Sequence, residues 1–150
     1  MARNFDNLRA EIWRIAARDE LSERELIQGL LDTVGPSIEV DRACFNEADG
    51  DGMACTLEWA APGIKPSIGF RLPRVVQNQF VRPYPLEITL ESSIAALPSW
   101  VRPMATPLLQ TLAMALDIES VLIVPYSVAG GVVDGVLSFD VCRGKSAPRG

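Results

Sequence analysis

One segment, residues 119–142 (ESVLIVPYSVAGGVVDGVLSFDVC), constrains the possible folds more than any other. Two apolar runs rich in Val, Ile, Leu and Phe flank the tripeptide Ala129-Gly130-Gly131. Glycine tolerates the positive φ that tight hairpin turns require, and β-branched and aromatic residues suit a pleated, mostly buried surface. The segment therefore predicts a long antiparallel hairpin, and with it a fold that contains a sheet.

The length and composition indicate a single domain that needs no disulfides or structural metal. At 150 residues and 48% hydrophobic content, the chain can bury a core of its own. Its net charge of −5 disfavours the basic surface that nucleic-acid binding requires, so no nucleic-acid partner is expected. The chain has no histidine, which removes the most common general base and metal ligand. We therefore expect no catalytic residue, no metal and no cofactor.

Neither a membrane span nor a secretory signal is expected. No window of about 18 apolar residues exists, and the N-terminal sequence MARNFDNLRAEIW is mixed in charge. Cys44, Cys55 and Cys142 form an odd, sparse set, which favours reduced thiols over a disulfide framework. A cytoplasmic location follows as the default expectation.

The first half of the chain predicts two helices and a hairpin. Over residues 4–19 an apolar stripe recurs every three or four residues, which indicates an amphipathic helix. Ser22 followed by Glu25 is a capping-box pattern, so a second helix should begin near residue 23, and Pro36 should end it. Residues 40–48 and 53–60 are strand-like runs around Asp-Gly-Asp-Gly, which predicts an antiparallel hairpin.

The second half begins with an irregular crossover. Residues 61–85 contain seven prolines and glycines, so at most one helical turn is expected there, near 74–80, and this region should cover a pocket. A strand is expected over 86–90 and a helical turn over 94–100. Thr106 and Pro107 predict the start of a helix of roughly ten residues that leads into the closing hairpin. Adjacent strand pairs with separate helices favour the α+β class.

Several motifs occur in an order that resembles GAF domains attached to bacterial sensor kinases and related signalling proteins. Residues 31–48 (LDTVGPSIEVDRACFNEA), the strand end TLEW at 56–59 and residues 118–142 carry the resemblance, which covers roughly 22–142. The matched positions are Val40, Asp41, Arg42, Phe45, Glu58, Trp59, Ser120, Val124, Pro125, Gly130, Gly135, Phe139 and Asp140.

The resemblance implies a GAF-like central antiparallel sheet of about five or six strands with helices on both faces. It also implies a ligand pocket on one face and helices on the other that pair across a dimer. We expect residues 1–20 to form a leader helix and 21–150 the sensory domain. Such domains usually end in a helix, whereas residues 143–150 (RGKSAPRG) are short and helix-poor. Either the chain is excised from a larger signalling protein, or another chain completes the helical face.

Aromatic residues are the candidates for the pocket, because an aromatic body with one polar atom suits partial burial against a ligand. Ordinary core packing is the alternative for Trp59. The predicted pocket residues are Phe45, Trp59, Tyr84, Trp100 and Tyr126. The leading helix is the predicted dimer surface, because aromatic anchors are enriched in such interfaces, although packing on its own sheet is equally compatible with the pattern. Its residues are Phe5, Leu8, Ile12, Trp13 and Ile15.

Four more specific chemistries receive weaker support. Residues 47–58 (EADGDGMACTLE) approach a calcium loop, but they begin with Glu and are flanked by strands, so a solvated turn explains them better. A GAF-like chain with three cysteines is similar to the free methionine sulfoxide reductases, which are small GAF enzymes that use cysteine thiolates. Cys44 and Cys55 could face each other across the first hairpin. The Cys-Gly pocket motif of those enzymes is absent, however. Bilin-attaching GAF domains carry a cysteine on a pocket helix or loop, and no cysteine here lies in such a place. The Asn-Lys, Phe and Asp-Glu signature of cyclic-nucleotide-binding GAF domains is absent too.

The sequence therefore predicts a non-catalytic GAF module for signal transduction, as in two-component systems. It would bind a small molecule or partner and transmit the signal through the paired helices of a homodimer. Two alternatives stay open: a thiol-based enzyme of the free methionine sulfoxide reductase type, and a pocketless dimerisation module. Nothing in the sequence identifies the ligand.

Overall fold

The computed structural model describes residues 5–129 and 132–142. The elements in chain order are α1 (Phe5–Ala16), α2 (Glu23–Val34), the 3₁₀ turn η1 (Gly35–Ser37), β1 (Arg42–Asp49), β2 (Gly52–Ala60), β3 (Arg71–Pro73), α3 (Arg74–Phe80), β4 (Leu86–Thr89), α4 (Leu90–Ala96), α5 (Arg102–Leu116), β5 (Ile118–Ala129) and β6 (Val132–Cys142). These strands form a six-stranded sheet in the order β3-β2-β1-β6-β5-β4. Each neighbouring pair is antiparallel.

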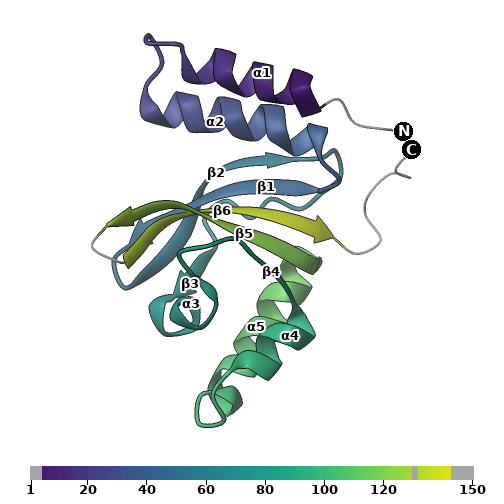
Figure 1. Cartoon of the computed structure of the whole chain (residues 1–150). Helices are drawn as coiled ribbons and strands as arrows, with labels where there is room; N and C mark the ends of the chain where they lie inside the picture. Colours follow the sequence, from purple (N-terminus) through teal and green to yellow (C-terminus); the bar gives the residue numbers. More distant parts are fainter. Residues whose placement is uncertain (1–4, 130–131, 143–150) are drawn as a thin grey trace.

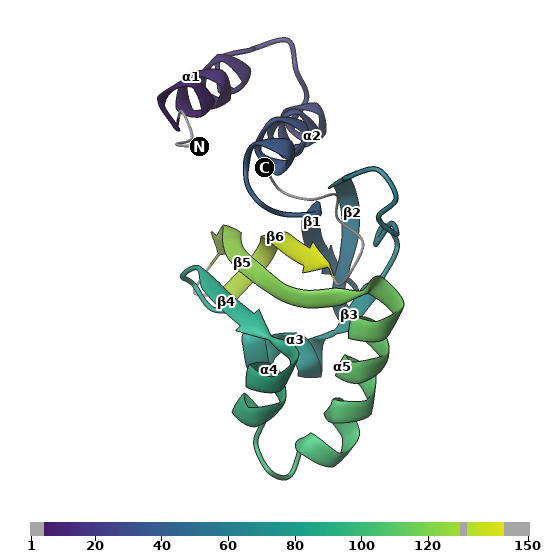
Figure 2. The same ribbon diagram turned by 90° about the vertical axis from the view of Figure 1, so that its right-hand side faces the viewer.

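The sheet separates two helical layers (Figures 1 and 2). On one face, α2 packs against β1 and β2, and α1 packs on α2. On the opposite face lie α3, α4 and α5, of which α3 contacts β2 and β3, α4 contacts β4, and α5 contacts β5. The expected α+β architecture, with helices on both faces of an antiparallel sheet, is confirmed.

The capping box predicted for the second helix is present. The Ser22 hydroxyl accepts a hydrogen bond from the Glu25 backbone N–H at 3.2 Å, and the Glu25 carboxylate accepts one from the Ser22 N–H at 3.1 Å. These two bonds satisfy N–H groups that a helix start otherwise leaves without partners. The helix ends at Val34, and Pro36 lies in the 3₁₀ turn that follows.

Both predicted hairpins form. β1 and β2 meet at a turn in which Gly50 has φ +60°, and Arg71 pairs with Asp49 (3.4 Å) and Asp51 there, so the acids that resembled a calcium loop bind a guanidinium. β5 pairs with β6 from Ile118 to Ala129. Residues 130–131, the glycines of the expected closing turn, and residues 143–150 lie outside the described part of the chain.

Two helices differ from the expected boundaries. The first, α4, begins at Leu90 rather than near residue 94, because Thr89 and Ser92 cap each other's backbone N–H groups. The second, α5, begins at Arg102 and runs for 15 residues, so that Pro107 lies inside it rather than at its start. Pro103 already supplies the proline that suits a first turn. β3 forms within the region that was expected to be irregular, by pairing with Gly52–Ala54.

Each helical layer has its own apolar core. On the α2 side the buried residues are Ile27, Leu31, Ala43, Phe45 and Phe139. On the other side they are Phe80, Leu97, Val101 and Ala105. The sheet is therefore covered on both faces, which explains why the first four residues of β1 are all buried. Of the helices that the structure describes, none has the length and apolar character needed to cross a membrane.

Candidate ligand cavity

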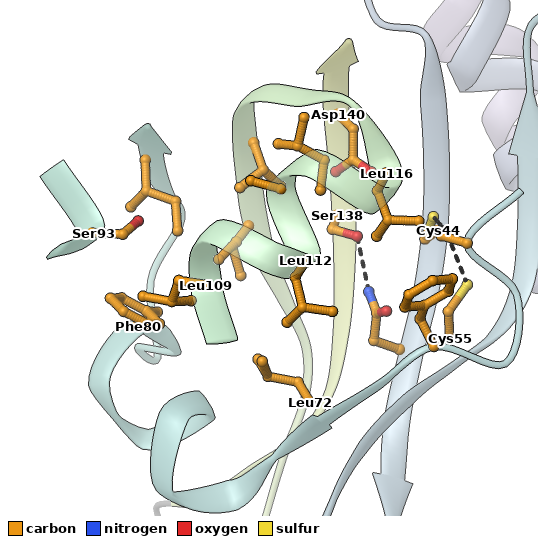
Figure 3. A pocket seen from close by; sticks show the side chains of 18 of the residues that line it. Cys44, Cys55, Leu72, Phe80, Ser93, Leu109, Leu112, Leu116, Ser138 and Asp140 are labelled. Carbon is orange, nitrogen blue, oxygen red and sulfur yellow. Dashed lines mark hydrogen bonds between the residues drawn. The ribbon is translucent and has the colours of Figure 1, made fainter. Parts of the chain in front are cut away.

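A cavity of about 220 Å³ lies between the sheet and helices α3, α4 and α5 (Figure 3). All six strands of the sheet contribute to it, and α5 contributes Leu109, Leu112 and Leu116. The cysteines Cys44 and Cys55 lie at one end in this view, and Phe80 and α4 at the other. The lining is mainly apolar, with a few polar side chains at fixed positions, as in many small-molecule sites.

Strand alternation decides which residues reach the cavity. Successive side chains of a strand point to opposite faces of the sheet. On β1, Cys44 and Asn46 line the cavity, whereas Ala43 and Phe45 belong to the core against α2. On β6, Val136, Ser138 and Asp140 line the cavity, whereas Leu137 and Phe139 pack on the α2 side.

A β-bulge places Cys55 in the cavity. Cys44 pairs with Glu58 and Phe45 with Leu57, but Asn46 then pairs with Cys55, so Thr56 is the extra residue of β2. With regular pairing, Thr56 would stand beside Asn46 and Cys55 would face α2. The bulge therefore brings the thiols of Cys44 and Cys55 to the same face of the sheet.

The two thiols share a hydrogen-bonded cluster with Ser67 and Glu58. The Ser67 hydroxyl lies 2.6 Å from Glu58 Oε2, 3.0 Å from Cys44 Sγ and 3.6 Å from Cys55 Sγ. The Ser67 backbone N–H also donates to Glu58 Oε2 at 2.6 Å. The hydrogen bond between the thiols raises the pKa of Cys44, to which burial adds, and lowers the pKa of Cys55. A proton is therefore held on Cys44, and Cys55 is the thiol that ionises more readily.

A buried ion pair lies beside this cluster. Arg42 Nε donates to Asp140 Oδ2 at 2.7 Å, and neither side chain is accessible to more than a few per cent (0% and 6%). Arg42 also donates to the carbonyls of Lys65 (2.6 Å) and Leu116 (3.1 Å). Burial raises the pKa of Asp140, and the Arg42 guanidinium opposes that rise. Arg42 thus joins β1, β6, the loop after β2 and the C-terminal end of α5.

A second polar contact crosses from β1 to β6. The Asn46 side-chain amide donates to the Ser138 hydroxyl at 2.9 Å, a bond drawn as a dashed line to Ser138 in Figure 3. It also donates to the Val136 carbonyl at 3.3 Å. The amide oxygen of Asn46 remains available to a donor in the cavity, as does the lone pair of Ser138 that this bond leaves free. These two residues can therefore orient a polar group on an otherwise apolar ligand.

None of the five aromatic residues predicted for the pocket lines this cavity. Phe45 and Tyr126 pack edge to face at 5.2 Å, and Phe45 belongs to the α2-side core. Trp59 packs on that same core, as the alternative reading allowed. Tyr84 and Trp100 are 56% and 73% exposed. The physical reason is strand parity for Phe45, Trp59 and Tyr126, since each occupies the alternate position that faces α2.

Residues 61–85 were expected to cover a pocket, and Ser67, Leu72 and Phe80 of that region line this cavity, but sequence reasoning did not identify the individual lining residues. Asp140 and its ion-pair partner Arg42 were noted only as motif matches, and their pairing becomes visible once β1 is placed beside β6. Cys44 and Cys55 were recognised as possible neighbours across the hairpin, but they were not assigned to the pocket. Of the other polar residues in the lining, Ser138 stands between Leu137 and Phe139 in an apolar run, and that exception to the pattern is the signal that marks it, whereas nothing in the local sequence marks Asn46 or Ser93.

The predicted dimer residues lie on α1, where no side chain is fully buried. Phe5 and Trp13 are exposed, Trp13 to 69%. Leu8, Ile12 and Ile15 are half-buried, and Ile15 points toward α2, where its Cγ2 atom lies 3.4 Å from the site of a Cβ on Gly29. Part of the stripe therefore packs on α2, and the remainder is exposed on this chain.

Comparison of sequences identifies no relative. No protein-family model matches the chain, and no curated protein is significantly similar to it.

Comparison of structures identifies the fold. The chain is similar to the phycoerythrobilin-bound GAF domain of a cyanobacterial phytochrome, with a TM-score of 0.67 and 14% identity over 96% of this chain and 86% of the other. The phycocyanobilin-bound GAF domain of a cyanobacterial phytochrome has a TM-score of 0.67 and 15% identity over 99% of this chain and 85% of the other. The chromophore-binding domain of the Stigmatella aurantiaca bacteriophytochrome has a TM-score of 0.65 and 15% identity over 94% of this chain and 52% of the other. This chain therefore has the GAF-domain fold.

Proposed function

We propose that this chain is a non-catalytic sensory module that binds a compact, mainly apolar molecule in the cavity between the sheet and α5. The observation that carries the proposal is the cavity itself. Most of its lining is apolar, with leucine, isoleucine and valine side chains, and its polar side chains include the hydrogen-bonded pair Asn46 and Ser138 and, elsewhere in the wall, Ser67, Ser93 and Asp140. Several similar structures bind bilins in the same fold, which supports a ligand-binding role without identifying the ligand.

The size of the cavity favours a ligand with one ring. Typical ligand pockets measure about 300–1,000 Å³, and an engineered apolar cavity of about 150 Å³ accepts benzene. At about 220 Å³, this cavity suits a single-ring compound with one polar substituent. A bilin has four linked rings and would require a larger cavity than this one.

A thermal-shift experiment with phenol, indole and benzoate tests this proposal. A probe present at 100 times its Kd should stabilise the fold by about 2.7 kcal/mol, and should raise Tm by about 5–10 °C. Ala113→Leu adds atoms to the cavity wall and should abolish the rise, whereas Ala115→Leu, at an exposed position of the same helix, should leave it intact. Equal responses in the two variants would contradict the proposed site.

The same proposal assigns dimerisation to α1. Its support is the exposed Phe5 and Trp13 on a helix without buried residues. Sedimentation equilibrium should show a dimer that Trp13→Ser weakens. Trp100→Ser, which changes an indole of similar exposure outside α1, is the matched control. A strictly monomeric chain at high micromolar concentration would remove dimerisation from the proposal.

A second candidate is a thiol-based reductase, which the contact between Cys44 and Cys55 favours. In such a reaction the two thiols would be oxidised to a disulfide while methionine sulfoxide is reduced, and its oxygen would leave as water. Methionine formation that Cys55→Ala abolishes would establish this activity. Its absence in the unchanged chain, under reducing conditions, would leave the sensory function as the remaining proposal.

A further inference from the structure

We propose that Cys44, Cys55 and Glu58 form a zinc-binding site at the sheet end of the cavity. One thiolate comes from β1, and the other thiolate and the carboxylate come from β2. Cys44 stands directly opposite Glu58, and the bulge at Thr56 turns Cys55 to the same face. The ligand atoms of the three residues all lie within 4.8 Å of one another. This inference stands independently of the proposed organic ligand.

The spacing of these atoms is close to that of a tetrahedral zinc site. Two sulfurs at about 2.3 Å from one Zn²⁺ are about 3.8 Å apart, and a sulfur and a carboxylate oxygen are about 3.5 Å apart. Cys44 Sγ lies 3.8 Å from Glu58 Oε2. Because no pair in the cluster exceeds 4.8 Å, a contraction of about 1.3 Å or less between any two ligand atoms would form the site.

No side-chain cation occupies Glu58 in the described part of the chain. Among those residues, no lysine or arginine lies within ion-pair distance of its carboxylate, and Arg42 forms its ion pair with Asp140. Zn²⁺ brings two positive charges and the two thiols release two protons, so binding would leave the net charge of the site unchanged. The ion would therefore add no net charge to this buried end of the cavity.

Ser67 explains how the three ligands stay together without metal. Its hydroxyl contacts all three of them and would have to rotate away for an ion to enter. Its backbone N–H would remain bonded to Glu58 Oε2 and would orient the carboxylate, as outer-shell donors do in metal sites. Cys44, Cys55 and Ser67 all line the cavity, so the fourth coordination position is accessible to water or to a ligand in the cavity.

Titration of the reduced, metal-free chain with Co²⁺ and then Zn²⁺ tests the site without any substitution. One equivalent of Co²⁺ should produce a thiolate-to-cobalt charge-transfer band and strong visible absorption from tetrahedral geometry. Zn²⁺ should remove both signals, and up to two protons should be released per ion bound. Absence of the charge-transfer band at stoichiometric cobalt would overturn the proposal.

Substitutions then identify the ligands. Cys44→Ala, Cys55→Ala and Glu58→Gln should each weaken Zn²⁺ binding by at least the 10–100-fold that loss of an outer-shell partner costs. Cys142→Ala, which removes a buried thiol that bonds the Leu116 carbonyl, should leave it unchanged. Ser67→Ala should bind Zn²⁺ at least as tightly as the unchanged chain. Binding that survives Cys44→Ala and Cys55→Ala together, or that disappears in Cys142→Ala, would refute the assignment.

Discussion

Replacing Arg42 by methionine should destabilise the fold by about 4 kcal/mol at neutral pH. The Arg42 side chain is fully buried, and its guanidinium bonds the Asp140 carboxylate and two main-chain carbonyls. Methionine fills much of the same volume but can neither neutralise Asp140 nor donate to the carbonyls. The variant therefore isolates the electrostatic role of Arg42 from its packing.

The magnitude follows from the uncompensated carboxylate. Breaking a buried ion pair by removing one partner costs about 3–5 kcal/mol, because the remaining charge stays buried without a counterion. The carbonyl of Leu116 would lose a donor as well, at a cost of about 1 kcal/mol or more if water does not reach it. The free energy of unfolding of a natural domain is typically about 5–15 kcal/mol, so a loss of about 4 kcal/mol leaves a marginally stable fold. The Tm should be lower by about 8–16 °C.

The deficit should depend on pH in a specific direction. Burial already raises the pKa of Asp140, and removal of Arg42 takes away the interaction that opposes the rise. An acid whose pKa is raised in the folded state is favoured there in its protonated form. The deficit of Arg42→Met should therefore be small below the unfolded pKa of about 3.9, and should grow as the pH rises toward the folded pKa.

Urea denaturation followed by tryptophan fluorescence measures these effects. The double variant Arg42→Met/Asp140→Leu should recover more than half of the lost stability, since apolar replacement of a buried pair is often neutral. Arg24→Met, which breaks the exposed pair with Glu47 (2.9 Å), should cost no more than about 1 kcal/mol. A loss of less than about 1 kcal/mol in Arg42→Met, without rescue by Asp140→Leu, would refute the reasoning.

Three further outcomes are expected from the same denaturation assay. Gly35→Ala should destabilise the fold by about 1–3 kcal/mol, because its Cβ would lie 2.3 Å from Cε3 of Trp59. Gly29→Ala, whose Cβ would have its nearest neighbour at 3.4 Å, should instead stabilise α2 by up to about 1 kcal/mol. Equal effects of the two substitutions would count against the steric argument. Burial raises the pKa of Cys142 from 9.0 to about 11, so this thiol should contribute up to about 2.7 kcal/mol to the fall in stability between pH 9 and pH 11, in addition to the contribution of Cys44, whose pKa is also raised. The fall should therefore be shallower in Cys142→Ala, and an equally steep fall would exclude Cys142 as a contributor. Ser22→Ala should cost about 1 kcal/mol through loss of the α2 cap, and no measurable loss would show that the helix is held by packing alone.

The sequence contained enough information for the fold because local signals and burial agree. The capping box at Ser22 and the turn at Gly50 are short-range features, and each acts within a few residues. The expectation failed at one element through long-range pairing and at another through a local cap that was not recognised. β3 consists of three residues that become a strand only because Gly52–Ala54 lies beside them. The start of α4 depended on a Thr89–Ser92 cap that resembles ordinary loop composition.

The candidate site could be predicted less well, because aromatic character says nothing about which face of a strand a residue occupies. Phe45 and Trp59 are equally suited to a pocket and to a core, and their positions in the alternating strand pattern place them in the core against α2. Parity itself changes at the bulge after Phe45, where β2 gains Thr56. A single extra residue in one strand therefore determines whether Cys55 lies in the cavity, and no local pattern in β2 marks that residue.

The same alternation connects the cavity directly to the helical layer on the other face of the sheet. On β1, Asn46 lines the cavity and its neighbour Phe45 packs in the α2 core; on β6, Ser138 and Leu137 stand in the same relation. A shift of either strand therefore moves side chains on both faces at once. A ligand changes the helical layer only to the extent that it binds two arrangements of these strands with different affinity. Such coupling is reciprocal. If a ligand increases the dimerisation constant of the pairing through α1 by some factor, its own affinity for the dimer must exceed its affinity for the monomer by the same factor.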